Sequence, residues 1–144
     1  MLVTTAYRPS PEEEERAKRI AAELGARWVP RGSDSLPRLR RKYGDGDILV
    51  AAANALRYER EGLPPLFFHP GMASIRIKRL QAGQTDPLIA ASGARPGDSV
   101  LDCTAGLGAD ALVFAHAVGE NGRVTALESE AVVALLLREG LGTW

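Results

Sequence analysis

The sequence has little cysteine and no long apolar run. Its single cysteine, Cys103, excludes an internal disulfide and a cysteine-rich metal site, so no metal is expected. No segment approaches the roughly 20 apolar residues that a membrane-spanning helix needs. The N-terminus also lacks the basic and apolar regions of a secretory signal. These absences predict a cytoplasmic protein without a membrane partner.

Charge of one sign is not in excess over the whole chain, since 18 Lys and Arg balance 18 Asp and Glu. The distribution is uneven. Residues 1–97 hold 16 basic and 11 acidic residues, whereas residues 98–144 hold 2 and 7. This asymmetry permits a polyanion to contact the first part while a small cofactor binds the second. Ordinary solvated surface charge explains the same numbers.

The first 70 residues read as an α/β module. Ser10, Pro11 and the glutamates that follow are typical of a helix start. A second, shorter helix is expected within 33–44. Hydrophobic and β-branched runs predict strands at 2–7, 27–30, 47–52, 55–59 and 66–68, with the third and fourth joined at Asn54.

The remaining residues are expected to be helical first and then to alternate between strand and helix. Helices are predicted at 72–80 and 86–91, followed by a strand at 99–103, a helix at 110–118, a strand at 123–127 and a helix at 130–138. The predicted division is therefore an N-terminal α/β module (1–70), a helical connector (71–97) and the start of a nucleotide-binding domain (98–144).

The turn TAGLGAD, between the strand at 99–103 and the next helix, is rich in glycine. Gly106 and Gly108 lack a Cβ atom, so backbone N–H groups there can approach a ligand closely. Glu128 follows Gly106 by 22 residues, at the end of the next strand. That separation is typical of a carboxylate that binds ribose hydroxyls. The pattern indicates an adenosine-type cofactor at the carboxyl ends of the strands.

Two other phosphate-binding turns were weighed against this reading. No GxxxxGK[ST] motif occurs, so a triphosphate-binding loop is disfavoured. A nicotinamide dinucleotide remains an alternative, because Gly106, Gly108 and Ala111 satisfy G-x-G-x-x-A. Asp102 at the mouth of the turn would repel a pyrophosphate but suits an ammonium or sulfonium group. The charge therefore favours S-adenosylmethionine.

The stretches VLDCTAGLGADALVFA and ALESEAVVALLLREGL resemble two motifs of class I S-adenosylmethionine-dependent methyltransferases. The resemblance is strongest to the group around the small-subunit rRNA guanine-N2 methyltransferase and its uncharacterised Gram-positive relatives. It implies an α/β fold in which the N-terminal module precedes the first two βα units of a Rossmann-like sheet. It also implies S-adenosylmethionine as the cofactor and rRNA as the substrate. The implied cofactor-binding residues are Asp102, Thr104, Ala105, Gly106, Gly108, Asp110, Glu128 and Ser129.

Residues outside these motifs give weaker indications. No catalytic residue is identified. Cys103 is expected to be buried and His116 to be packed in its helix, rather than to act as a nucleophile or a base. The upstream segment FFHPGMASIRIKRL is similar to the lead-in of the relatives, and its basic character indicates contacts to RNA phosphates. The candidate substrate-binding residues are His69, Arg76, Lys78 and Arg79, and a second basic cluster comprises Arg38, Arg40, Arg41 and Lys42.

The later strands of the family and its Asp-Pro-rich motif have no counterpart before Trp144. We therefore expect a piece of a longer methyltransferase that alone binds cofactor weakly at most and does not transfer methyl groups. An unpaired sheet edge would permit homo-oligomers. The alternatives are a non-catalytic RNA-binding or assembly module and a fragment of an NAD-dependent oxidoreductase.

Overall fold

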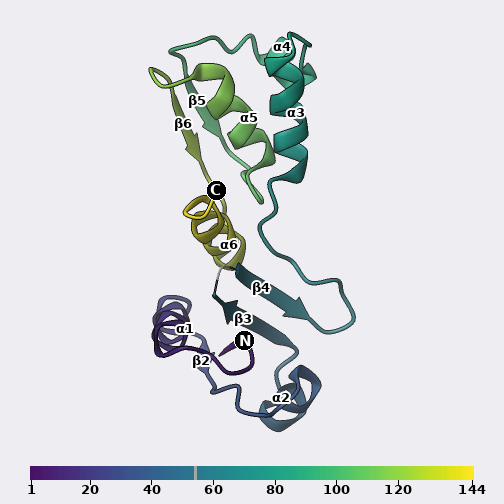
Figure 1. Cartoon of the computed structure of the whole chain (residues 1–144), viewed down its shortest axis with the longest axis vertical. Helices are drawn as coiled ribbons and strands as arrows, with labels where there is room; N and C mark the ends of the chain where they lie inside the picture. The colour runs from purple at the N-terminus through teal and green to yellow at the C-terminus, as the bar shows by residue number, and fades with distance from the viewer. Residues whose placement is uncertain (54) are drawn as a thin grey trace. The chain divides into compact units, whose positions relative to one another are not determined.

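The computed structural model describes residues 1–53 and 55–144 (Figure 1). Asn54, the predicted junction between two strands, lies outside the described residues. The chain divides into two compact units. The first unit comprises Met1–Phe68 and Arg138–Trp144, and the second comprises His69–Leu137.

A four-stranded sheet forms the centre of the first unit, with strand order β2-β1-β3-β4. The central strand β1 is fully buried and lies parallel to β2 and β3, whereas β4 runs antiparallel to β3. The carboxyl ends of three parallel strands therefore meet at one edge of the sheet. The strands are β1 (Leu2–Thr5), β2 (Arg27–Trp28), β3 (Asp47–Ala52) and β4 (Ala55–Arg60).

Two helices, α1 (Pro11–Glu23) and α2 (Leu36–Tyr43), are drawn on opposite sides of this sheet in Figure 1. The predicted start of α1 is confirmed. The Ser10 hydroxyl accepts a hydrogen bond from the Glu13 N–H at 3.2 Å, and the Glu13 carboxylate accepts one from the Ser10 N–H at 2.6 Å. This reciprocal cap satisfies two N–H groups that a helix end leaves unpaired. Ile20 on α1 and Leu39 on α2 are buried against the sheet region.

The strand predicted at 66–68 is wrong. Leu66 forms only an isolated bridge with Tyr58, through reciprocal backbone bonds of 2.7 and 2.9 Å. Pro64 and Pro65 precede Leu66 and carry no N–H group, so a longer ladder has no donors on that side. The segment therefore leaves the sheet after one pair.

The second unit contains one pair of parallel strands, with register from Ser99↔Arg123 to Asp102↔Ala126. Helix α5 packs against both strands, and α3 packs against α5 (Figure 1). Val113 and Val118 of α5 are buried in this unit. The elements are α3 (Gly71–Gln81), α4 (Pro87–Ser92), β5 (Ser99–Asp102), α5 (Ala109–Val118), β6 (Arg123–Ala126) and α6 (Ala131–Leu141), whose last residues belong to the first unit.

The observed architecture is the predicted α/β fold, with an N-terminal α/β unit followed by two βα units, β5-α5 and β6-α6. Among the described residues, no further strand pairs with the outer edge of β5 or β6. Within the described part of the chain, no helix has both the length and the apolar character needed to cross a membrane.

Candidate functional site

The glycine turn between β5 and α5 holds two residues with positive φ for different steric reasons. Gly106 has φ +53°, and a Cβ atom added there would meet no protein atom within 4 Å. Gly108 has φ +81°, and an added Cβ atom would lie 2.5 Å from Cδ1 of Leu137. The sequence predicts space for a ligand beside both glycines. In the structure only the space beside Gly106 is open, because Leu137 fills the other.

Asp102 ends β5 and anchors the start of the turn. One carboxylate oxygen, Oδ1, accepts a hydrogen bond from the Thr104 N–H at 3.0 Å. The other, Oδ2, is buried and has no hydrogen-bond partner among the described residues. Buried polar atoms are nearly always paired, so an orphaned carboxylate oxygen marks a place for an absent donor. A cationic donor would suit this oxygen best.

Glu128, just after β6, links the two strand ends. Its Oε2 accepts a hydrogen bond from the Gly106 N–H at 2.9 Å, and its Oε1 accepts one from the Glu130 N–H at 2.9 Å. The bond from Glu130, followed by those from Gly106 and Ser129, lowers the pKa of Glu128 against the opposing effect of burial. The carboxylate is therefore ionised at neutral pH. An ionised carboxylate has about four acceptor positions, so Glu128 keeps capacity for further hydroxyl donors.

A cavity of about 310 Å³ opens at the carboxyl ends of β5 and β6. This is the edge at which ligands bind in open parallel α/β sheets. The volume lies at the lower end of the range for small-molecule sites. The lining residues are Cys103, Thr104, Leu127, Glu128 and Ser129.

The structure brings together three of the predicted cofactor-binding residues in this cavity, namely Thr104, Glu128 and Ser129. Ala105 is buried and donates its N–H to the Leu127 carbonyl at 2.9 Å, so it ties the turn to β6. Asp110 accepts a hydrogen bond from Arg76 at 2.5 Å.

The cavity also contains residues that the sequence argument did not assign to it. Leu127 is not among the predicted cofactor-binding residues. Its position next to Glu128, directly after β6, was the feature of the sequence that could have indicated it. Cys103 was expected to be buried, and that expectation is wrong, because its side chain is exposed and lines the cavity. His116, expected to be packed, is also exposed, because its position on α5 turns away from the buried residues of that helix.

The candidate substrate-binding residues have different surroundings. Arg76 is held between two carboxylates, through bonds of 2.8 and 2.9 Å to Asp86 and the bond to Asp110. The hydrogen bonds to Asp86 are the largest cause of a raised Arg76 pKa. Lys78 and Arg79 are exposed in the last turn of α3. The exposed His69 accepts a hydrogen bond from the Gly71 N–H at 3.2 Å.

Comparison with known proteins identifies related sequences. A family model described as "Putative SAM-dependent methyltransferase" matches residues 49–143. The chain is 38% identical over 144 residues to the uncharacterized protein YpiP of Bacillus subtilis (strain 168), covering 99% of this chain and 55% of that protein. It is 35% identical over 134 residues to ribosomal RNA small subunit methyltransferase J of Thioalkalivibrio sulfidiphilus (strain HL-EbGR7), covering 92% and 49% respectively.

A solved structure shares the fold. The SAM-dependent methyltransferase NGO1261 from Neisseria gonorrhoeae aligns with a TM-score of 0.56 and 19% sequence identity, over 99% of this chain and 52% of that one. At this identity the likeness concerns the fold alone. The chain spans about half the length of the curated relatives it matches.

Proposed function

The chain belongs to this family of SAM-dependent methyltransferases, and we propose that residues 98–144 supply one side of its cofactor site. The family's cofactor is S-adenosylmethionine, which replaces the nicotinamide alternative. One observation carries the proposal: an ionised Glu128 lines a cavity at the carboxyl ends of two parallel strands and accepts a hydrogen bond from Gly106 of the open turn.

Residues that line the cavity or adjoin its lining in the chain fit the chemical groups of S-adenosylmethionine. The open space beside Gly106 lets a ligand approach the backbone. The buried, unpaired Oδ2 of Asp102 suits a cationic group, and the cofactor carries both an ammonium and a sulfonium. Glu128 has acceptor capacity for ribose hydroxyls.

Each group has a proposed task in binding. Asp102 accepts hydrogen bonds from the cationic methionine end, Glu128 accepts them from the ribose, and the hydroxyls of Thr104 and Ser129 serve as further polar contacts. Leu127 supplies an apolar wall. When bound, S-adenosylmethionine supplies a methyl group on a positively charged sulfur. Transfer of that group depends chiefly on alignment, so this chain needs no acid–base pair for its part of the site.

The proposed substrate of the whole protein is ribosomal RNA. The support is the similarity to ribosomal RNA small subunit methyltransferase J and the excess of basic residues in 1–97. A cytoplasmic location follows from that substrate. The proposed division of labour assigns RNA contacts to the α/β module (1–70) and the basic connector (71–97), and cofactor contacts to 98–144. The outer edges of β5 and β6 support a further proposal of self-association, which sedimentation velocity would check.

Cys103 provides a test that does not depend on activity. It is exposed, lines the cavity and is the single cysteine of the chain, so a maleimide reports on this site alone. We expect S-adenosylhomocysteine to slow labelling of the wild-type chain. Glu128→Gln should require several-fold more ligand for the same protection, because a neutral amide is a weaker acceptor for hydroxyl donors. Glu120→Gln, at an exposed position of the same unit, is the matched control.

The competing outcomes are separable. Protection by NAD but not by S-adenosylhomocysteine would point to a dinucleotide site and contradict the proposal. Equal labelling rates with and without either ligand would show that this chain holds no cofactor site. Equal protection of Cys103 in wild type and Glu128→Gln would show that Glu128 does not contact the ligand, although the ligand binds in the cavity.

A further inference from the structure

Arg31, in the loop after β2, is a buried cation with two guanidinium nitrogens that have no acceptor among the described residues. Its side chain belongs to a residue that is only 8% exposed, and neither Nε nor Nη1 has a hydrogen-bond partner among the described residues. A guanidinium carries five N–H donors and remains charged at all physiological pH values. Burying it without acceptors destabilises a fold, so such a residue is expected where a ligand supplies the acceptors.

The neighbour of Arg31 is an aromatic ring. The guanidinium carbon lies 4.4 Å from the centroid of the Tyr7 ring, and Tyr7 is 57% exposed. This cation–π contact offsets part of the desolvation of the guanidinium, but it accepts no N–H hydrogen bond. One ring therefore contacts both the buried cation and solvent, and a second planar group has access to it.

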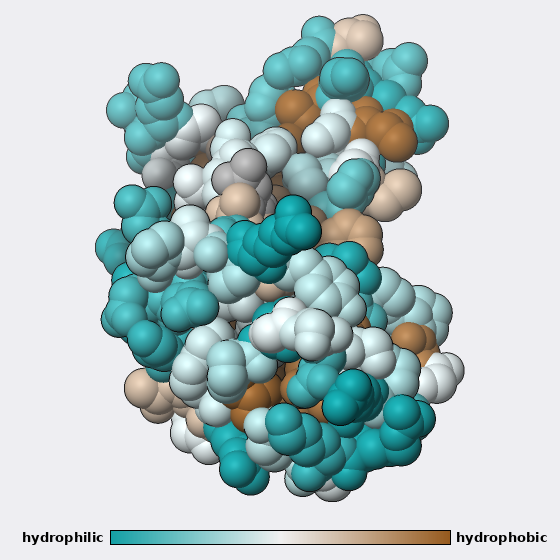
Figure 2. All heavy atoms as spheres, turned by 60° about the horizontal axis from the view of Figure 1, so that its bottom comes forward, coloured by the Kyte–Doolittle hydropathy of each residue, from teal (hydrophilic) through white to brown (hydrophobic). Residues whose placement is uncertain are grey.

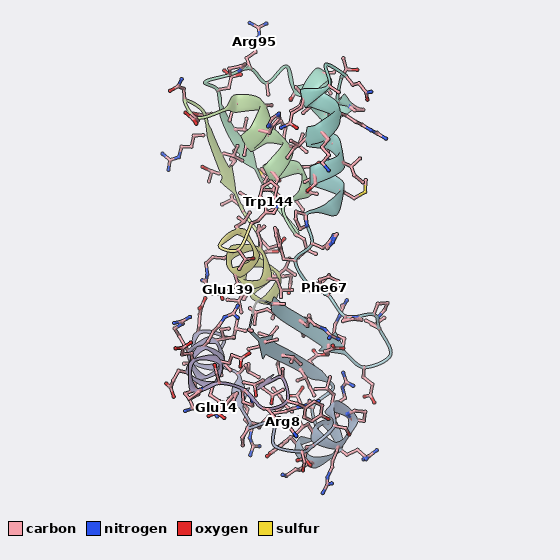
Figure 3. All side chains as sticks on the ribbon, in the orientation of Figure 1. Arg8, Glu14, Phe67, Arg95, Glu139 and Trp144 are labelled. Carbon is pink, nitrogen blue, oxygen red and sulfur yellow. The ribbon has the colours of Figure 1, made fainter. Side chains whose placement is uncertain are left out.

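The pair lies at the edge of the sheet where ligands bind in parallel α/β folds. Tyr7 follows β1, Arg31 follows β2, and these two strands are parallel neighbours. Arg8, labelled in Figure 3, lies between β1 and α1. Its φ of +54° is uncommon for a residue other than glycine, and such conformations are concentrated at functional sites.

The surrounding charge is mixed, since Glu12, Glu13 and Glu14 lie in the first turn of α1, just after Arg8. Asp34 is the carboxylate of the loop after Arg31, and two cations, Arg38 and Lys42, already share it at 3.0 and 3.5 Å. Arg8 is exposed in the loop before α1. Figure 2 brings this end of the first unit forward, and most of the visible face is hydrophilic. The unpaired N–H groups of Arg31, and not the balance of the surrounding charges, favour an anion.

We propose that Tyr7 and Arg31 form a nucleotide-binding site for single-stranded RNA, in which Arg31 binds a backbone phosphate and Tyr7 stacks on a base. The inference rests on the proposed RNA substrate of this family member. A phosphate supplies the acceptors that the guanidinium lacks, and a base supplies a flat apolar partner for the exposed ring. The site belongs to the first unit and is separate from the cofactor cavity of the second.

The test measures binding of a fluorescein-labelled oligoadenylate to the full 144-residue chain by fluorescence anisotropy at several salt concentrations. We expect Arg31→Met to weaken binding about tenfold and to reduce the salt slope by about 1, since one phosphate contact is lost. Tyr7→Leu should also weaken binding about tenfold, whereas Tyr7→Phe should bind as wild type, because the ring is what stacks. Arg19→Met, an exposed arginine on α1, is the charge-matched control.

Thermal stability separates binding from structure. Arg31→Met should have an unchanged or higher Tm, because the substitution removes a buried charge without acceptors. A lower Tm with unchanged RNA affinity would overturn the inference. If Arg31→Met loses both stability and affinity, the variants of the exposed Tyr7 distinguish the two explanations. Weaker RNA binding by Tyr7→Leu than by Tyr7→Phe supports the site, and equal RNA affinity of these two variants overturns it. Arg31-dependent binding of polyaspartate in preference to RNA would indicate a protein partner instead.

Protection of Cys103 by S-adenosylhomocysteine is measured on the same samples. It distinguishes a failure of the proposed RNA site from a failure of the proposed cofactor site. A wild-type chain that is protected but does not bind the oligoadenylate would refute the RNA site alone. A wild-type chain that binds the oligoadenylate but is not protected would refute the cofactor site alone.

Discussion

Arg76 provides the sharpest prediction of stability, because it holds two carboxylates of the second unit together. Arg76 and Asp86 have side-chain exposures of 20% and 5%, whereas Asp110 is 57% exposed. Asp86 also caps α4 by accepting hydrogen bonds from the N–H groups of Leu88 and Ile89. We consider the substitution Arg76→Met, which keeps an aliphatic stem of similar length and removes the cation.

The loss of unfolding free energy in Arg76→Met depends on which of the two carboxylate partners is buried. The exposed contact with Asp110 is worth about 0–1 kcal/mol. Removing the cation leaves the buried Asp86 carboxylate with the backbone N–H groups of Leu88 and Ile89 as its partners, which costs about 3 kcal/mol, the lower end of the range for a broken buried ion pair. The free energy of unfolding of a domain is about 5–15 kcal/mol. Arg76→Met should therefore remove a large part of the stability of the second unit, and Asp110→Asn should remove little.

The same pair predicts a pH dependence. The hydrogen bonds from Arg76 are the largest cause of lowering the Asp86 pKa from 3.8 to about 2. A depressed pKa in the folded state stabilises the protein above the unfolded pKa, by about 2 kcal/mol for this shift, and the contribution is lost as the pH falls from about 4 to 2. In Arg76→Met burial favours the neutral acid instead. The difference in stability between wild type and variant should therefore narrow below about pH 4.

Hydrogen exchange measured by mass spectrometry is the suitable assay. Both tryptophans, Trp28 and Trp144, belong to the first unit, so their fluorescence does not report directly on residues 69–137. We expect faster exchange in that range for Arg76→Met and wild-type exchange for Arg79→Met, whose side chain is exposed on the same helix. A loss of unfolding free energy below about 1 kcal/mol in Arg76→Met would refute the reasoning.

Three further substitutions test local features of the two units. Ser10→Ala removes the reciprocal cap of α1 and should cost about 1 kcal/mol in urea unfolding followed by Trp28 fluorescence; an unchanged midpoint would show that the cap does not contribute. Gly108→Ala and Gly106→Ala both force a side chain into positive φ, at about 1–2 kcal/mol. Gly108→Ala must also displace Leu137, so it should be the less stable of the two by hydrogen exchange, and the opposite order would contradict the packing role of Gly108.

Structural features that depend on residues close together in the chain were predictable from the sequence. Contacts between residues far apart in the chain were not. The start of α1 depends on Ser10, Pro11 and Glu13, which lie within one turn. The ion pairs of Arg76 depend on Asp86 and Asp110, which lie 10 and 34 residues away, so the basic character of the segment indicated an RNA contact but gave no sign of these pairs.

The candidate cofactor site shows the same limit. The spacing of Gly106 and Glu128 predicted that the two would serve one ligand, and the structure joins them by a hydrogen bond. Which glycine leaves open space depended on Leu137, on a different helix, and the sequence treated Gly106 and Gly108 alike. The exposure of Cys103 depended on what covers the carboxyl end of β5, and no local pattern encodes that.

The bond between Glu128 and Gly106 has a consequence for how a ligand is received. The side chain of Glu128 is already held in one orientation by its hydrogen bond to the glycine turn before a nucleoside binds. Little side-chain entropy therefore remains to be lost when the nucleoside associates. A substitution at the carboxyl end of β6 should accordingly also change the conformation at the carboxyl end of β5, because the two ends act as one preorganised unit.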